Sequence, residues 1–452
     1  MSAKSWSTFQ RPGRLWLVLA SVLAPAPLAT ASVLGELGPD FELRASAGYI
    51  STPDGASIYA WGYSAAGAPM QYPGPTLLVN QGATVEVTLT NDLPAVAGNV
   101  SIVFQGHDLN AVDGDGGVAD GIEGGVPGLL TQEAVPGGSV TYRFVAGKPG
   151  TYLYSSGTRA DLQVEMGLFG ALIVYPSGGP GCAYSNAGTC YDRENLFVLS
   201  EADLDIHRTV EIQVAAGGPI EVATSPYYDP EYWFINGRCA PDTMAADGDA
   251  TLPSQPYSAI TRMVPGERLL LRVVGAGRQA HPFHHHGNHA RVLARDGQLL
   301  ENGSGQLVGP SVFTITSVPG GTTDAIFEWT GKGLNWDVYG SPHVNGPDTC
   351  NGLAGPSLGF DPTTREYCPD HTKAIPVQLP ELQQLTFGGF WSGSPYLGVL
   401  GSLPPGEGGL NPFGAYTYMW HSHSEREIIN NDIFPGGMMT MLVIEPPGTE
   451  IP

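Results

Sequence analysis

Histidines are concentrated in two short windows of this sequence. The first reads HPFHHHGNH, from His281 to His289, and the second reads YMWHSHSEREIINNDIFPGGMM, from Tyr418 to Met439. Side chains at positions i and i+2 of a strand project to the same face, about 7 Å apart along the backbone. The pairs that this spacing brings to one face are His284 with His286 and His421 with His423. All four imidazoles can therefore reach one metal cluster.

Four converging imidazoles can hold one metal ion, or two with help from a carboxylate such as Glu425 or Glu427. Copper is favoured by the affinity order of divalent ions, and zinc is the alternative. The competing interpretation is a remnant site whose histidines hydrogen-bond to each other and to water. Histidines crowded in this way are rarely kept for packing alone, so the sequence predicts a metal site. We expect His285 and His289 to face away from it, and His107 to be a loop residue rather than a ligand.

The rest of the chain indicates many short strands that would hold these windows. The 452 residues include 62 Gly and 39 Pro, over a fifth of the chain, and only 14% are charged. No long polar-faced helical pattern appears, so we expect an all-β protein of strands joined by turns. Segments with strand patterns are 84–90, 139–144, 170–175, 268–274, 312–318, 324–329 and 438–444.

Both histidine windows resemble motifs of the multicopper oxidases, which carry an HPxHxHG element and an HCHxxxH…GM element near the C-terminus. Supporting matches are YPGPTLLV at 72–79, GTYLY at 150–154 and GLFGALIVYP at 167–176. The matches follow the family's order along nearly the whole chain that lies beyond Ala31. The resemblance implies two cupredoxin-like Greek-key β-sandwich domains and copper-dependent oxidoreductase chemistry.

The chain departs from that family at the blue copper site. The family's cysteine between the two C-terminal histidines is Ser422 here, and a hydroxyl cannot replace the thiolate that a blue copper needs. The family's second histidine for this site aligns with Glu427, so only His281 survives of the ligands. The resemblance therefore implies that the blue centre is absent. The candidate metal ligands are His281, His284, His286, His421 and His423.

The first domain departs further from the family. Where the family reads HWHG the chain reads VFQG, with Val103 and Gln105 at the histidine positions, and YHSH is replaced by YSSG, with Ser155 and Gly157. Four of the eight histidines that hold the family's three-copper cluster are therefore missing. Small two-domain members build this cluster between neighbouring chains, so the resemblance implies a homotrimer, or a partner subunit that supplies the missing ligands. An electron donor is a further possible partner.

The expected organisation is a signal peptide at 1–31, a first cupredoxin-like domain at 32–176, a linker at 177–193 and a second domain at 194–448. The segment from about 330 to 411 is rich in Gly and Pro and reads as an insertion in the second domain.

The N-terminal segment 1–31 has a basic start, an apolar stretch and the small-residue site Ala29-Thr30-Ala31. We therefore expect an exported protein, periplasmic or extracellular, without a membrane span. The formal net charge of −23 argues against nucleic acid as a partner.

Five cysteines suit an oxidising compartment. We expect local disulfides between Cys182 and Cys190 and between Cys350 and Cys368, with Cys239 free or paired elsewhere. The glycine-rich acidic segment 107–125 is either a weak calcium or manganese loop or, in our interpretation, a solvated turn.

The sequence thus predicts an exported, multicopper-oxidase-like protein that binds copper through histidines of its second domain. It would act as an oxidoreductase without a blue centre, or serve as a non-catalytic secreted or surface scaffold that keeps the cupredoxin fold. Whether the chain is an enzyme stays open at this point.

Overall fold

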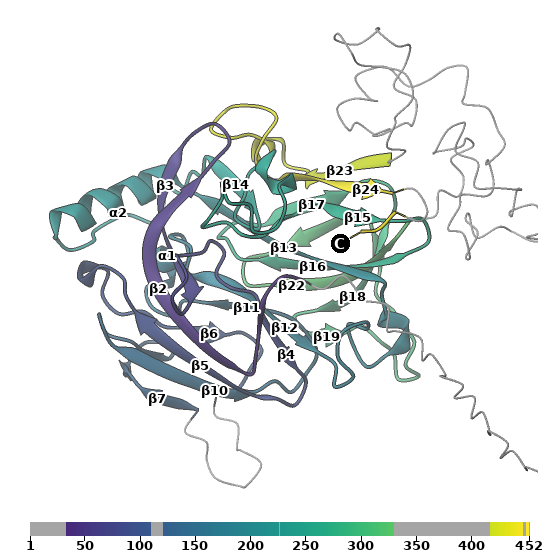
Figure 1. Ribbon diagram of the computed structural model, residues 1–452, viewed down its shortest axis with the longest axis horizontal. Helices are drawn as coiled ribbons and strands as arrows, with labels where there is room; N and C mark the ends of the chain where they lie inside the picture. Colours follow the sequence, from purple (N-terminus) through teal and green to yellow (C-terminus); the bar gives the residue numbers. More distant parts are fainter. Residues whose placement is uncertain (1–32, 110–120, 226, 330–415, 446–448, 452) are drawn as a thin grey trace, which may run out of the picture.

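Two β-sandwiches make up the protein (Figure 1). The computed structural model describes residues 33–109, 121–225, 227–329, 416–445 and 449–451. Strands up to residue 175 form the first sandwich, and strands from residue 193 onward form the second. The all-β prediction of two sandwich domains is confirmed.

The first sandwich consists of two five-stranded sheets, in the orders β1-β4-β12-β11-β6 and β3-β2-β5-β10-β7. The bounds of its strands are β1 Glu36–Leu37, β2 Asp40–Ser51, β3 Ser57–Ala65, β4 Leu77–Asn80, β5 Thr84–Asn91, β6 Val103–Phe104, β7 Ile122–Gly124, β10 Ser139–Val145, β11 Gly150–Ser155 and β12 Phe169–Tyr175. The small hairpin of β8 (Val126–Pro127) and β9 (Gln132–Glu133) lies beside them. Alternate residues of β5 and β10 are buried, as half-buried strands require, whereas β12 is buried throughout.

The second sandwich carries both histidine windows. One sheet has the order β14-β13-β16-β22-β18-β19 with β20 paired to β18, and the other has the order β15-β24-β23-β17-β21. The bounds are β13 Arg193–Ala202, β14 Tyr232–Ile235, β15 Thr261–Met263, β16 Arg268–Gly275, β17 His281–His285, β18 Ala290–Arg295, β19 Gln298–Leu299, β20 Ser311–Val312, β21 Thr314–Ser317, β22 Thr322–Glu328, β23 Tyr416–Ser422 and β24 Met439–Ile444. The strand predicted at 312–318 is therefore divided into β20 and β21, each of which joins a different sheet.

A helix that the sequence interpretation missed projects from the sandwiches (Figure 1). Helix α2 spans Leu204–Ala216, whereas α1 is the single turn Ala160–Gln163. Asp203 caps α2, because its Oδ1 accepts from the backbone N–H of Asp205 and Ile206, and Gly217 ends it at φ 68°. The all-β class still holds, and α2 is an addition to it that the strand and turn patterns did not reveal. The capping pair Asp203 and Gly217 was the signal that could have revealed the helix.

The predicted Cys182–Cys190 disulfide is confirmed, and Cys239 is a buried free thiol. Cys350 and Cys368, the signal peptide, the insertion at 330–411 and the centre of the acidic segment lie outside the described residues. The domain boundaries stay predictions. Within the described ranges, no helix combines the length and apolar character needed to cross a bilayer.

Candidate metal centre

Two neighbouring strands of one sheet carry the histidines. Strands β17 and β23 run antiparallel, with His284 opposite His421 and Phe283 opposite Ser422. Strand β24 supports β23 on its other side, with Met439 opposite His421. Side chains of directly paired residues on neighbouring strands point to the same face of the sheet, so His284 and His421 lie side by side although their windows are far apart in the sequence.

The imidazoles of His284, His286 and His421 form a compact group. One ring nitrogen from each lies within 4.8 Å of the others. Nε2 of His286 and Nε2 of His421 are 3.3 Å apart. Two nitrogens bound at 2.0–2.1 Å to one tetrahedral ion would be roughly 3.3 Å apart, so this pair already has the spacing that an ion requires.

His423 lies beside this group. Its ring centroid is 5.0 Å from that of His284 and 5.7 Å from that of His421. Among described residues, the metal-spaced group contains the first three histidines but not His423. The structure thus brings four of the five predicted ligands together, with three in the tighter arrangement.

Backbone carbonyls fix the orientation of two rings. His284 directs Nδ1 toward the carbonyl oxygen of Phe313, at 2.8 Å, and His421 directs Nδ1 toward the carbonyl of Ser422, at 2.6 Å. A carbonyl only accepts, so Nδ1 carries the proton in each ring and Nε2 keeps its lone pair. Such outer partners orient metal-binding histidines. The sequence reasoning missed Phe313, because a backbone acceptor leaves no mark on residue type.

Burial keeps these imidazoles neutral. Loss of hydration, reinforced by neighbouring imidazoles, lowers the pKa of His286 to about 3 and that of His421 to about 4. Burial also lowers the pKa of His284. Uncharged rings are the form that binds metal, so the cluster is ready to accept an ion at neutral pH.

His281 is placed differently from the other predicted ligands. Its Nδ1 lies 2.9 Å from Oε2 of Glu427, and its Nε2 lies 2.9 Å from Oε2 of Glu201. Both ring nitrogens are thus engaged by carboxylates. The sequence did not point to Glu201, which is distant along the chain and lies on another sheet.

The other histidines have roles outside the cluster. His285 is buried, with Nε2 within 3.1 Å of both the Val312 carbonyl and the Ala290 N–H. His289 is exposed, and its ring stacks edge-on against Phe313. The ring of His107 packs between Phe144 and Tyr152.

Comparisons with known proteins point to the family whose motifs the histidine windows resemble. A family profile described as multicopper oxidase matches residues 63–179. The chain is 36% identical over 106 residues to multicopper oxidase MCE of Talaromyces pinophilus, and 31% identical over 163 residues to laccase 1 of Metarhizium acridum. Part of the chain is thus similar to multicopper oxidases.

These matches cover 24% and 36% of this chain but only 15% and 22% of the two relatives. Among solved structures, the multicopper oxidase mgLAC has a TM-score of 0.54 at 18% identity, and the match covers 91% of this chain and 87% of mgLAC. The structural likeness establishes the shared fold.

The blue copper of the multicopper oxidases does not fit the residues at its position. Ser422 Oγ donates to Oε2 of Glu427 at 2.6 Å, and the same carboxylate oxygen contacts His281. Position 422 offers a hydroxyl in place of the thiolate, and both nitrogens of the surviving imidazole are already engaged. This part of the chain holds a hydrogen-bonded network instead.

Other residues also occupy the first-domain positions that align with histidines of the multicopper oxidase cluster. Val103 and Ser155 pair across β6 and β11, and a Cβ added to Gly157 would lie 2.6 Å from Cγ2 of Val103. The valine therefore fills the space that a side chain at 157 would need. Gln105 lies next to Gly320, on the wall of a separate cavity.

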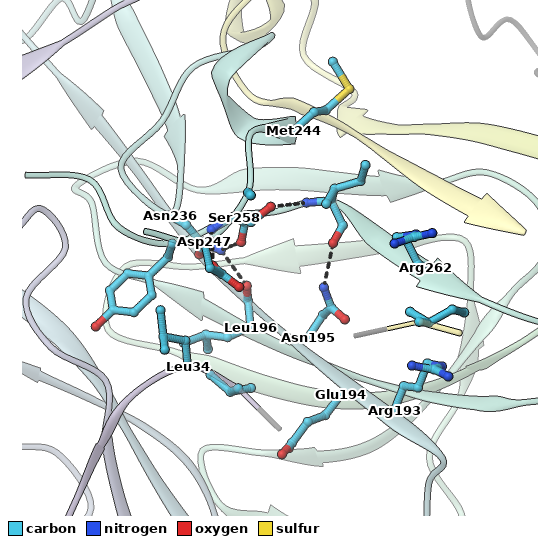
Figure 2. Close-up of a pocket in the computed structure, with 15 residues that line it drawn as sticks. Leu34, Arg193, Glu194, Asn195, Leu196, Asn236, Met244, Asp247, Ser258 and Arg262 are labelled. Carbon is cyan, nitrogen blue, oxygen red and sulfur yellow. Dashed lines mark hydrogen bonds between the residues drawn. The ribbon is translucent and has the colours of Figure 1, made fainter. Parts of the chain in front are cut away.

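A cavity of about 450 Å³ lies between Leu34, β13 and Ile451, and none of the clustered histidines lines it (Figure 2). Its two arginines are already paired, Arg193 with Glu267 and Arg262 with Glu445. Asn195 donates to the Ile260 carbonyl, and Asp247 accepts from the Ser258 N–H. Because these polar side chains have partners within the protein, the histidine cluster is the stronger candidate site.

Proposed function

We propose that this protein binds one metal ion through His284, His286 and His421, with His423 as the fourth ligand. Copper is the favoured ion, by affinity order and by the relatives, and zinc is the alternative. The observation that carries the proposal is the grouping of three ring nitrogens within 4.8 Å, two of them 3.3 Å apart. We leave His281 out of the site, because carboxylates occupy both of its ring nitrogens.

The proposed role is that of an exported, multicopper-oxidase-like protein without a blue centre. Bound copper would supply one-electron redox chemistry, and the chain's own residues hold neutral imidazoles in fixed orientations around it. The partial exposure of His284 and the exposure of His423 leave room for a small ligand or for a partner surface. We also propose that the protein is exported to the periplasm or cell exterior. There it would assemble as a homotrimer or with a partner subunit.

One observation favours a non-catalytic scaffold as the second candidate. Val103 closes the space beside Gly157, so the first-domain wall supplies no replacement for the missing histidines. A protein whose first domain supplies no metal ligands would use the cupredoxin fold for binding or assembly.

Metal analysis of purified full-length protein tests the main proposal. After dialysis against Cu²⁺ or Zn²⁺ and removal of loosely bound ions, we expect about one ion per chain. When both ions are present together, the protein should retain Cu²⁺. A metal content near zero with both ions would leave the scaffold role.

The copper-loaded protein is expected to be nearly colourless. Without a thiolate ligand, it should show weak ligand-field bands and no intense blue charge-transfer absorption. Absorption and electron paramagnetic resonance spectra of the loaded protein provide the measurement. An intense blue band would show that a cysteine such as Cys239 reaches copper, contrary to its burial in the structure.

Laccase-type turnover is expected to be absent or marginal. Reduction of oxygen to water requires electron entry through a blue site and a complete three-copper cluster, and the ligand sets of both are broken here. Oxygen consumption with a phenolic substrate, measured before and after copper loading, tests this. Robust turnover would mean that another subunit restores the missing ligands.

A further inference from the structure

A buried hydrogen-bonded network lies on the opposite face of the sheet from the histidine cluster. Side chains alternate in direction along a strand, so Ser422 points away from its neighbours His421 and His423. Its hydroxyl meets Glu427, which meets His281, which in turn meets Glu201. The side chains of His281 and Glu201 are fully buried, and that of Glu427 is 8% exposed.

The contacts of Glu201 and Glu427 fix the charge of this network. Glu201 accepts through Oε1 from the backbone N–H of Arg278 at 2.6 Å, from that of Gln279 at 2.8 Å and from the Tyr228 hydroxyl at 3.0 Å. Its other oxygen, Oε2, faces His281 as an acceptor. His281 lies between two such acceptors and must donate from both ring nitrogens, which only the doubly protonated imidazolium can do. Burial alone would lower the pKa of His281, but the hydrogen bonds and charges of both carboxylates outweigh it and raise the pKa to about 9.

The same network connects the two strands that carry the metal ligands. His281 is the first residue of β17, and Ser422 is the last residue of β23. The backbone N–H of His423 also donates to the carbonyl of Pro282 at 2.8 Å. Movement of β23 relative to β17 would therefore disturb the chain of contacts that runs from His281 through Glu427 to Ser422.

We propose that His281, held as an imidazolium between Glu201 and Glu427, is a positioning residue that braces the two ligand-bearing strands from behind. Through Ser422 the brace sets the positions of His421 and His423. The two N–H groups of His281 thus join Glu201 on β13 to Glu427 beside β23. The effect on metal affinity rests on the proposed metal site, whereas the protonation of His281 does not.

Nitrogen-15 NMR of metal-free, full-length protein tests the protonation. At pH 7.5 we expect protons on both ring nitrogens of His281, and the Glu427→Gln variant should lower the pKa of His281 by at least one unit. The other charged or titratable groups around it are Glu201, Tyr228, Arg278 and Glu165. A neutral His281 tautomer at pH 7.5 would overturn the proposal, even if the protein binds no metal at all.

A matched pair of variants tests the positioning. Ser422→Ala removes the hydroxyl that joins β23 to the brace and leaves the contacts of His281 intact, whereas Ser422→Thr keeps a hydroxyl. We expect Ser422→Ala to weaken Cu²⁺ binding about 10-fold and to broaden the copper hyperfine lines, with affinity restored to within about 2-fold in Ser422→Thr. Circular dichroism confirms that each variant is folded. Folded Ser422→Ala protein with unchanged affinity and spectrum contradicts the positioning role. If Ser422→Ala does not fold, the copper affinity and hyperfine lines of Glu427→Gln test the positioning instead, and unchanged values there contradict it.

Discussion

Replacing His421 with alanine should remove most of the bound copper. Its Nε2 lies 3.3 Å from that of His286, and the Ser422 carbonyl holds its ring in the binding orientation. Changing a residue that only orients a ligand costs about 10- to 100-fold in metal affinity, so loss of a ligand itself should cost ~100-fold or more. His284→Ala should have the same effect. His423→Ala should have a smaller one if His423 is the outermost ligand.

The measurement is copper bound per chain together with the dissociation constant from competition with a chelator of known affinity. His289→Ala is the matched control, because His289 belongs to the same window but is exposed and contacts Phe313. The copper affinity of the His289→Ala variant should equal that of the wild-type protein. Full copper content in both His284→Ala and His421→Ala would rule out a shared site and leave the histidines as a remnant.

Metal-free protein should lose stability steeply as the pH falls from 6.5 to about 4. Burial lowers the pKa of both His107 and His285 to about 4 and also lowers that of fully buried His207. The unfolded chain binds protons at these sites near pH 6.5, whereas the folded protein does not, so the free energy of unfolding decreases on acidification. For His285, which is 1% exposed, the shift corresponds to about 3 kcal/mol.

Two other groups, Glu165 and His281, lower the free energy of unfolding as the pH rises. The pKa of Glu165 is raised to about 8 by burial, and that of His281 to about 9 by its carboxylate partners, against the burial of its ring. The folded protein holds these protons more tightly than the unfolded chain. The contribution of Glu165 is therefore lost as pH rises from 4.5 to about 8, and that of His281 as pH rises from 6.5 to about 9. Because the histidines with a lowered pKa, those of the cluster included, oppose Glu165 below pH 6.5, we expect maximal stability near neutral pH.

Urea unfolding at half-unit steps between pH 4 and 9 tests this profile. Excess copper should shift the acidic limb to lower pH, because the ion binds only the folded, neutral cluster. In His285→Gln, whose amide oxygen can still accept from Ala290, the slope between pH 4 and 6.5 should decrease by about one proton. A flat profile in the wild-type protein over that range would contradict the assigned burial of these histidines.

The strands and the histidine cluster could be predicted because each depends on local residue pattern. The structure shows the alternating burial that the sequences of β5 and β10 predict. It also groups His284 with His286, as their i, i+2 spacing predicts. The resemblance to multicopper oxidases then placed the second window beside the first. Alternation, histidine spacing and family motifs can each be read from a few consecutive residues.

Partners from distant segments could not be found in the same way. Glu201 and Glu427 flank His281 only because β13, β17 and the turn Glu425–Ile428 meet in space. The sequence interpretation counted His281 as a ligand because it saw the residue type but not these acceptors. Likewise, the carbonyl of Phe313 orients His284 without any requirement on residue type. Helix α2 was missed for a different reason, since its capping residues were present but its apolar stripe is short.

The close approach of Val103 to position 157 has an evolutionary consequence. A histidine introduced at 157 alone would collide with a β-branched side chain that has little rotameric freedom, at 2.6 Å from its own Cβ. A histidine introduced at 103 alone would gain no second ligand from the adjoining strand. A ligand pair at this wall therefore requires both substitutions together, because the side chain at 103 must give up the space that a side chain at 157 would occupy.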